Sequence, residues 1–345
     1  MTPALPHPEI AARPGPDAGA DLLPVVERRC PDEAWHFRIS VPRGWSVGPG
    51  ALAAPTADAP GELALLRRDD PPAELRVLGV PLDREVDPAD WLDLSPLLDG
   101  KSVVSRQPVR TTAGIRGDVL STWTEADRAH AGRFLATKIG GRLFLLTFRT
   151  PIEHYAALAA DAARALGSFG PIDGSGGAYA ERVQTHAEAT PVRWAITLPG
   201  AWVLEPGSKG PDVASFQAEN VRSERSEEDE LVGKLACAVL ARSSAKRPRE
   251  VASAYLDAVR ENDITIDRDD FQEEAAGQPF DRAWYLVSDV DRGGVGGELR
   301  CRVLLHRRVW MLAGVLSPRR EDDAAAWMQN KRALDVVTGA VRLEV

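Results

Sequence analysis

A nine-residue segment that occurs twice constrains this chain more than any other feature. Residues 37–45 read Phe-Arg-Ile-Ser-Val-Pro-Arg-Gly-Trp, and residues 194–202 read Trp-Ala-Ile-Thr-Leu-Pro-Gly-Ala-Trp. In each copy an aromatic residue opens a short alternating strand, a proline ends it, and a tryptophan follows three residues later. These residues are Phe37, Pro42 and Trp45 in the first copy and Trp194, Pro199 and Trp202 in the second. The copies lie 202 − 45 = 157 residues apart, about the length of one domain, so we predict two related domains in tandem.

Segments rich in proline and small residues mark the limits of these domains. Residues 1–24 contain Pro, Ala and Gly and lack the basic start and apolar run of a signal peptide. We expect this segment to be a disordered tail. Residues 170–178 include Gly-Pro-Ile-Asp-Gly-Ser-Gly-Gly and are expected to form a linker. The first domain then covers residues 25–169 and the second covers residues 179–345.

Both halves follow the same order of strands, one middle helix, four further strands and a terminal helix. Asp87-Pro88 and Pro248 mark the starts of the two middle helices. The terminal helices are expected over residues 155–169 and 324–337, where apolar residues recur at helical spacing. A run of consecutive strands favours an antiparallel sheet. The fold class is therefore α+β, with two tandem antiparallel-sheet domains that are each flanked by helices.

A second correspondence supports the repeat. Residues 309–312, Val-Trp-Met-Leu, echo residues 143–146, Leu-Phe-Leu-Leu, in the late hairpin of each half. This alignment places Phe144 and Trp310 at equivalent positions.

A strand that ends in Pro-x-x-Trp, a middle helix, a meander with a late hairpin and a C-terminal helix together resemble the PsbP-like superfamily. The residues that carry the resemblance are Phe37, Pro42, Gly44 and Trp45, and then Trp194, Pro199 and Trp202. The superfamily includes a Ran-binding release factor, the PsbP subunit of photosystem II and bacterial chaperones for secretion-system effectors. The resemblance implies an α/β/α sandwich in each half and a protein-binding role. The second copy has Gly200-Ala201 where the first has Arg43-Gly44.

The charge and the cysteines limit the function classes and the compartment. A formal net charge of −9 argues against a general nucleic-acid binder, which needs a concentrated basic surface. Three widely spaced cysteines form no disulfide framework and fit a reducing compartment, so we expect a cytoplasmic protein. No run of 18 apolar residues occurs, and we therefore expect no membrane insertion.

No motif of catalysis, cofactor binding or metal binding emerges from the residue pattern. The six histidines include no pair at helical ligand spacing. Gly293-Gly294-Val295-Gly296-Gly297 is not followed by the Lys-Ser/Thr of a phosphate loop, so we interpret it as a flexible hairpin connection. The carboxylate clusters lack the alternating spacing of a calcium loop. We predict no catalytic residue, no cofactor and no metal.

Two tryptophans on meander strands, Trp123 and Trp284, are the candidate partner-binding residues. Large rings in alternating strands are also typical core residues, and that is the alternative interpretation.

Two functions follow from these observations. The first is a non-catalytic adaptor or chaperone for another protein, for example a secretion-system effector or another apolar segment, held on a sheet face or edge. The alternative is an enzyme or small-ligand protein with a pocket between the domains. The fold class alone does not decide between them.

Overall fold

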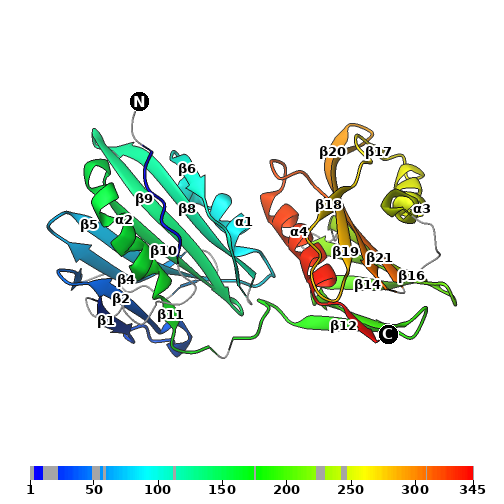
Figure 1. Ribbon diagram of the computed structural model, residues 1–345, viewed down its shortest axis with the longest axis horizontal. Coiled ribbons are helices and arrows are strands. Elements are labelled where there is room, and N and C mark those ends of the chain that lie inside the picture. Colours follow the sequence, from blue (N-terminus) through cyan, green and yellow to red (C-terminus); the bar gives the residue numbers. More distant parts are fainter. Residues whose placement is uncertain are drawn as a thin grey trace. The chain divides into compact units, whose positions relative to one another are not determined.

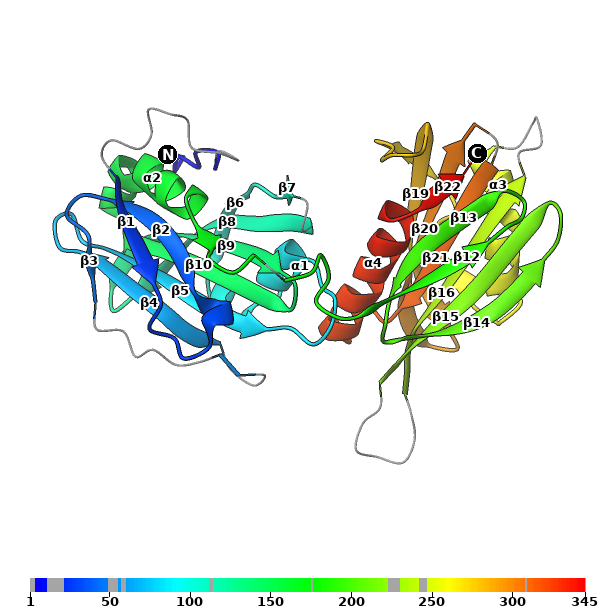
Figure 2. The same cartoon turned by 90° about the horizontal axis from the view of Figure 1, so that it is seen from below.

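The computed structural model describes residues 4–10, 22–48, 55–56, 60–111, 114–174, 176–222, 230–241, 247–307 and 309–344. The chain divides into two compact units, Met1–Ala180 and Glu181–Val345, and each is considered by itself (Figures 1 and 2).

The first unit contains strands on both sides of a short middle helix and ends with a long helix and a short strand. Its elements are β1 Leu22–Glu27, β2 Phe37–Pro42, β3 Ser46–Val47, β4 Gly61–Arg68, β5 Ala73–Pro81, α1 Pro88–Asp93, β6 Ser102–Arg106, β7 Val109–Thr111, β8 Gly114–Glu125, β9 Arg128–Ile139, β10 Arg142–Pro151, α2 Ile152–Gly167 and β11 Gly170–Pro171. Two 3-10 turns, Glu33–Trp35 and Pro96–Leu98, lie between these elements.

The second unit repeats this order element by element. Its elements are β12 Val183–Glu188, β13 Arg193–Pro199, β14 Trp202–Lys209, β15 Val213–Arg222, β16 Glu230–Ala241, α3 Pro248–Arg260, β17 Thr265–Ile266, β18 Gln272–Glu274, β19 Arg282–Arg292, β20 Val295–His306, β21 Val309–Ser317, α4 Ala324–Gly339 and β22 Arg342–Glu344.

The strand order is identical in the two units. In the first, a three-stranded sheet β1-β2-β11 accompanies an eight-stranded sheet β3-β4-β5-β10-β9-β8-β6 in which β7 also pairs with β8. In the second, β12-β13-β22 accompanies β14-β15-β16-β21-β20-β19-β17, and β18 also pairs with β19. Every strand pair described is antiparallel. The α+β class and the two tandem antiparallel-sheet domains expected from the sequence are confirmed.

Each large sheet is covered on both faces. The middle helix, α1 or α3, packs on one face, where Leu92 and Leu256 are buried. The terminal helix, α2 or α4, and the small sheet cover the other face, where Leu166 and Leu334 are buried. Local sequence explains where these helices start. Asp87 caps α1 by accepting a hydrogen bond from the Ala89 N–H (2.8 Å), and Asp323 caps α4 by accepting one from the Ala326 N–H (2.9 Å).

Matching hairpins fix which residues of the two units are equivalent. Ile139 pairs with Arg142 and His306 pairs with Val309, which gives an offset of 309 − 142 = 167 residues. The preceding hairpins give the same offset, 295 − 128 = 167, because Arg128 pairs with Glu125 and Val295 with Arg292. Both preceding hairpins turn on two residues with positive φ, which are Ala126 and Asp127 in the first unit and Gly293 and Gly294 in the second. The glycine-rich segment therefore contains a tight turn followed by the start of β20.

The predicted equivalence of Phe144 and Trp310 is wrong by one residue. Phe144 faces α2 in the core of the first unit, whereas Trp310 faces α3 in the second. The hairpin offset pairs Phe144 with Met311, which faces α4. Since successive side chains of a strand point to opposite faces, a shift of one residue moves the ring to the other side of the sheet.

The expected tail and linker also differ from the structure. Strand β1 begins at Leu22, inside the segment predicted to be disordered. Within the same segment, residues 4–10 lie on the first unit and bury Ile10, which is 6% exposed. Residues 1–3 and 11–21 lie outside the described residues. In the predicted linker, Gly170 and Pro171 pair with β2, and Asp173 forms an ion pair with Arg142 (3.4 Å).

Candidate functional site

The two tryptophans selected from the sequence lie on the faces covered by the middle helices. Trp284 is 8% exposed and packs in the core beneath α3, with its ring centroid 5.7 Å from that of Trp310. Trp123 is half-buried, stacks on His130 (5.6 Å between ring centroids) and has the Lys101 ammonium 5.3 Å from its ring centroid. Their proposed role in partner binding remains a prediction. The signature residues Phe37, Pro42, Trp194, Pro199 and Trp202 are buried, and Trp45 is half-buried.

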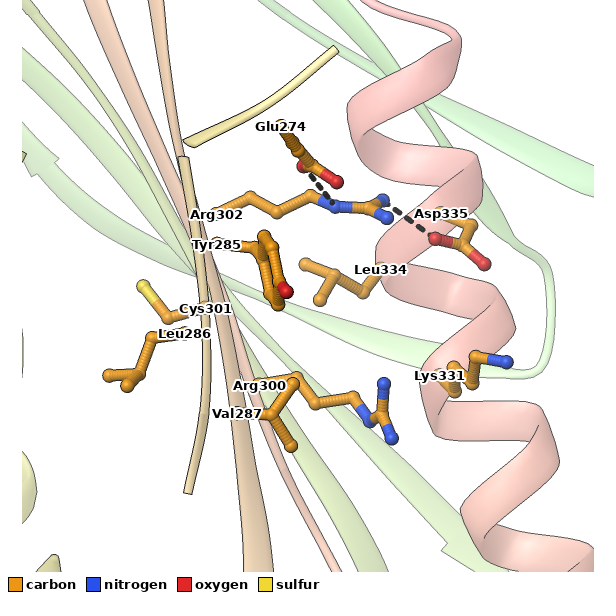
Figure 3. A pocket seen from close by; sticks show the side chains of 10 residues that line it. All are labelled: Glu274, Tyr285, Leu286, Val287, Arg300, Cys301, Arg302, Lys331, Leu334 and Asp335. Carbon is orange, nitrogen blue, oxygen red and sulfur yellow. Dashed lines mark hydrogen bonds and ion pairs between the residues drawn. The ribbon is translucent and has the colours of Figure 1, made fainter. Parts of the chain in front are cut away.

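The cavities of the second unit lie on the opposite face, beside α4. Two adjoining cavities of about 220 and 280 Å³ share Tyr285, Leu286 and Val287 of β19 as their floor. Arg300 and Arg302 of β20 extend this floor toward the helix (Figure 3). The helix supplies Lys331, Leu334 and Asp335 as one wall, and the edge segment supplies Arg268, Asp270, Gln272 and Glu274 as the other. We name this surface the α4 groove.

Arg302 ties the floor of the groove to both walls. Its Nε lies 3.2 Å from Oε1 of Glu274 on β18, and its Nη1 donates to Oδ1 of Asp335 on α4 (2.6 Å) (Figure 3). The same Nη1 donates to the Thr338 hydroxyl (2.9 Å). Planar guanidinium groups form such forked contacts well. Arg302 is therefore engaged within the protein and serves to hold the two walls together.

Three cations surround Trp327 at the other end of the groove. The Arg300 and Arg320 Cζ atoms lie 5.2 and 5.6 Å from the indole centroid, and the Lys331 Nζ lies 5.3 Å from it. The indole Nε1 donates to Oε1 of Glu298 (2.8 Å), and the Arg300 Nε donates to the same oxygen (2.5 Å). Cations stack favourably on an indole face. We name this region, formed by Trp327, Arg300, Arg320 and Lys331, the cationic end of the groove.

The equivalent groove of the first unit, which we name the α2 groove, is filled by the chain itself. Residues 4–10 run beside α2, as Figure 1 shows for the dark-blue segment. Leu5 packs against the cluster of Leu120 and Tyr155, and Ile10 belongs to the cluster of Leu135 and Phe144. The Gln107 amide donates to the His7 carbonyl (2.7 Å), so the connection between β6 and β7 also holds this segment.

A buried ion pair forms the floor of the α2 groove. The Arg133 Nε and Nη2 donate to the two carboxylate oxygens of Asp118 at 2.9 and 2.5 Å, and both side chains are 0% exposed. His7 Nε2 lies 3.1 Å from Asp118 Oδ1. Burial alone would raise the pKa of the Asp118 carboxyl, but the contacts with Arg133 and His7 outweigh burial and hold that pKa below its ordinary value. Asp118 is therefore ionised at neutral pH.

Ser105, His7 and Asp118 lie in a hydrogen-bonded line, an order also found in hydrolase triads. His7 Nδ1 is 2.6 Å from the Ser105 Oγ, and its Nε2 faces Asp118. Two features favour a structural role. Arg133 engages both oxygens of Asp118, and His7 belongs to the segment that fills the groove where a substrate would bind. Neither of the two cavities described for this protein lies at this line.

Neither groove was found from the sequence. Residues 4–10 contain two prolines and were assigned to a disordered tail by composition. The floor residues Arg133 and Arg300 come from strands with ordinary alternation. The available signal was a charged side chain at an inward position of a core strand, which requires a buried partner or an opening to solvent.

Comparisons with known proteins give similarities of fold at low sequence identity. No model of a protein family matches the sequence, and no curated protein matches it. Among solved structures, PsbP (CyanoP) of Synechocystis sp. PCC 6803 is similar over 46% of this chain and 97% of its own, with 12% identity and a TM-score of 0.34. The Ran-binding protein Mog1p of Saccharomyces cerevisiae is similar over 47% of this chain and 96% of its own, with 8% identity and a TM-score of 0.31.

Other similarities extend over nearly the whole chain, with coverages of 89–94%. The immunity protein TplEi of the Pseudomonas aeruginosa T6SS, solved with a peptide, covers 94% of this chain and 98% of its own, with 11% identity and a TM-score of 0.23. This chain spans about half, 48%, of a matching Bacteroides thetaiotaomicron protein. Within the described residues, none of the helices has the length and apolar character needed to cross a bilayer. The strand order that is repeated in the two units carries the fold assignment by itself.

Proposed function

We propose that this protein is a non-catalytic adaptor or chaperone that binds an extended segment of another protein in the α4 groove. The observation that carries the proposal is internal to the chain. The same surface of the same fold is covered by an extended segment, residues 4–10, in the first unit, whereas in the second unit it forms an open groove in the part of the chain that the structure describes. A sheet face between a helix and an edge strand accepts an extended peptide without rearrangement of the fold.

The lining of the groove favours a polypeptide guest with polar groups over a purely apolar one. Tyr285 and Val287 offer apolar surface, while Arg300 and Lys331 offer charge within the same groove. The sequence had suggested an apolar segment as the guest. The mixed lining argues instead for a segment that alternates apolar and polar side chains.

Photo-cross-linking tests the proposal in the cell of origin. A benzophenone amino acid at Val287, which is 38% exposed, is expected to cross-link one protein, and peptide mapping is expected to place the cross-links within one extended segment of it. The same amino acid at Val203, which is 56% exposed on β14, serves as the matched control. Cross-links scattered over many proteins, or equal in number from both positions, would contradict the proposal.

The enzymatic alternative has a separate test. Among the described residues, its one concrete candidate site is the hydrogen-bonded line of Ser105, His7 and Asp118. Hydrolysis of p-nitrophenyl acetate by the full chain is expected to equal that by the Ser105→Ala variant. A rate that the substitution lowers by a hundredfold or more would identify a catalytic serine and overturn the proposal.

A further inference from the structure

Equivalent arginines on the floors of the two grooves have different partners. The hairpin offset pairs Arg133 with Arg300 and Asp118 with Tyr285. In the first unit the guanidinium binds both oxygens of Asp118. In the second unit a tyrosine replaces this carboxylate, and its hydroxyl donates to Gln272 Oε1 (2.7 Å). The second unit thus keeps the arginine and pairs it with Glu298 of the same strand (2.5 Å), but it has no acid at the position on the neighbouring strand that Asp118 occupies in the first unit.

Arg300 retains hydrogen-bonding capacity that points to an external acid. Its Nε donates to Glu298, and its two Nη atoms make no hydrogen bond to the described residues. The side chain is 21% exposed and lines the cavity together with Lys331 (Figure 3). Beside Glu298 on one side and Lys331 on the other, the two Nη atoms are placed to donate two parallel N–H bonds to a further carboxylate.

The segment that fills the first groove indicates the backbone form of a guest. Residues 4–10 read Ala-Leu-Pro-His-Pro-Glu-Ile, with apolar anchors at Leu5 and Ile10 and a polar side chain, His7, over the floor between them. The prolines favour an extended backbone and lack the N–H that strand pairing would use. Such a segment lies across a sheet face and binds mainly through its side chains, with one backbone carbonyl, that of His7, accepting from Gln107.

We infer that the α4 groove takes an extended, proline-containing segment of a partner protein, and that Arg300 recognises a carboxylate side chain of that segment. This inference rests on the proposed function and specifies its ligand. The carboxylate of the guest occupies the role that Asp118 has in the first unit. An apolar side chain on either side of it packs on Val287 and on Leu334 of the groove.

Labelled peptides with blocked ends test the inference on the full chain. The probes have the sequence Ala-Leu-Pro-X-Pro-Gln-Ile, in which X is Asp, Asn or Lys, and their affinities are measured by fluorescence anisotropy at low salt. The Asp peptide is expected to bind about tenfold or more tightly than the Asn peptide, because charge-assisted hydrogen bonds are stronger than neutral ones. The Arg300→Glu variant is expected to lose this preference and to favour the Lys peptide.

Two further variants separate recognition from folding. Arg300→Gln removes the charge without placing a second acid beside Glu298, and it is expected to equalise the Asp and Asn peptides. Arg193→Glu, an exposed change on β13, is expected to leave the preference intact. Equal affinities for the Asp and Asn peptides, or tightest binding by the native residue 4–10 sequence, would overturn the inference. These outcomes leave the proposed function to its own test, since cross-links from Val287 report a protein guest of any sequence.

Discussion

The two units have the same strand order, but the corresponding faces of their large sheets are covered by different sets of elements. In the first unit three coverings lie on the α2 face of the large sheet, namely the small sheet, α2 and residues 4–10. In the second unit the small sheet and α4 cover the corresponding face, and the surface over β19 and β20 is a groove. Among the described residues, the two copies of the fold therefore differ in how fully this face of the large sheet is covered.

The charged residues on the floors of the two grooves differ in exposure, in line with this difference in covering. Arg133 and Asp118 are fully buried under residues 4–10, and their mutual hydrogen bonds offset the loss of water. Arg300 remains partly solvated, and therefore needs no full complement of partners within the chain. At this one pair of equivalent positions, the fully buried arginine is paired with an acid on the neighbouring strand, and the partly exposed arginine is not.

Removal of the buried arginine is expected to have the largest effect on stability. Arg133→Leu should lower the free energy of unfolding of the first unit by about 3–5 kcal/mol, because Asp118 remains buried without its cation. Arg300→Leu, the equivalent change, should cost about 1 kcal/mol or less. Urea unfolding followed by circular dichroism measures both. The added change Asp118→Leu should restore most of the loss from Arg133→Leu, and equal costs at the two arginines would break the comparison.

Loosening the segment in the α2 groove should have the next largest effect. Ile10→Ala removes a buried side chain and should destabilise the covered state by about 2 kcal/mol. Hydrogen exchange of residues 4–10 and of β9 should become faster, while exchange in β20 stays unchanged. Val203→Ala, at an exposed site, is the control and should change stability by about 0.5 kcal/mol or less. Unchanged exchange in residues 4–10 would show that Ile10 does not hold the segment.

Acid should weaken the first unit through Asp118. The pKa of this carboxyl is lower in the folded state than in the unfolded state, so its ionised form stabilises folding. The contribution is complete above the unfolded pKa, near pH 4, and is lost as the pH falls through the folded pKa. Unfolding free energies measured from pH 6 to pH 2 should decline, and the decline should be shallower in the Asp118→Asn variant. A parallel decline in that variant would assign the acid sensitivity to other groups.

The smallest expected signal concerns the buried thiols of the second unit. Burial raises the pKa of both Cys237 and Cys301, so neither is a thiolate at neutral pH. A disulfide reagent is expected to react with them only when the second unit unfolds, so in a Cys30→Ser variant the reaction reports on that unit specifically. Fast reaction in the native protein would contradict the described core.

Most helices and strands could be predicted from the sequence. The segments that cover the faces of the large sheets could not. The repeated Pro-x-x-Trp segments, the proline at the start of α1 and the apolar stripe of α2 each depend on local chemistry, and these predictions located two domains and their helices. Strands β1 and β11 were missed because short edge strands are stabilised by pairing with β2 and carry little local signal. The Phe144–Trp310 alignment failed because residue similarity does not fix register, whereas hydrogen-bonded hairpins do.

The grooves depend on contacts between residues far apart in the chain. His7 meets Asp118 across 111 positions, and no periodicity encodes such a contact. Composition assigned residues 4–10 to disorder, although Leu5 and Ile10 supply apolar anchors once a sheet face is present. The open groove in the second unit was equally hidden, since among the described residues a covering segment lies on the first unit alone.

Cysteine labelling at one pair of equivalent positions tests the central claim most directly. Leu120 and Val287 occupy the same place on the groove floors and are 0% and 38% exposed, and the three native cysteines are buried. A bulky maleimide is expected to label Val287→Cys rapidly and Leu120→Cys slowly in the full chain, and removal of residues 1–10 is expected to bring the second rate close to the first. Equal rates in the full chain, or a Leu120→Cys site that stays protected after the removal, would contradict the claim that one groove is filled and the other open.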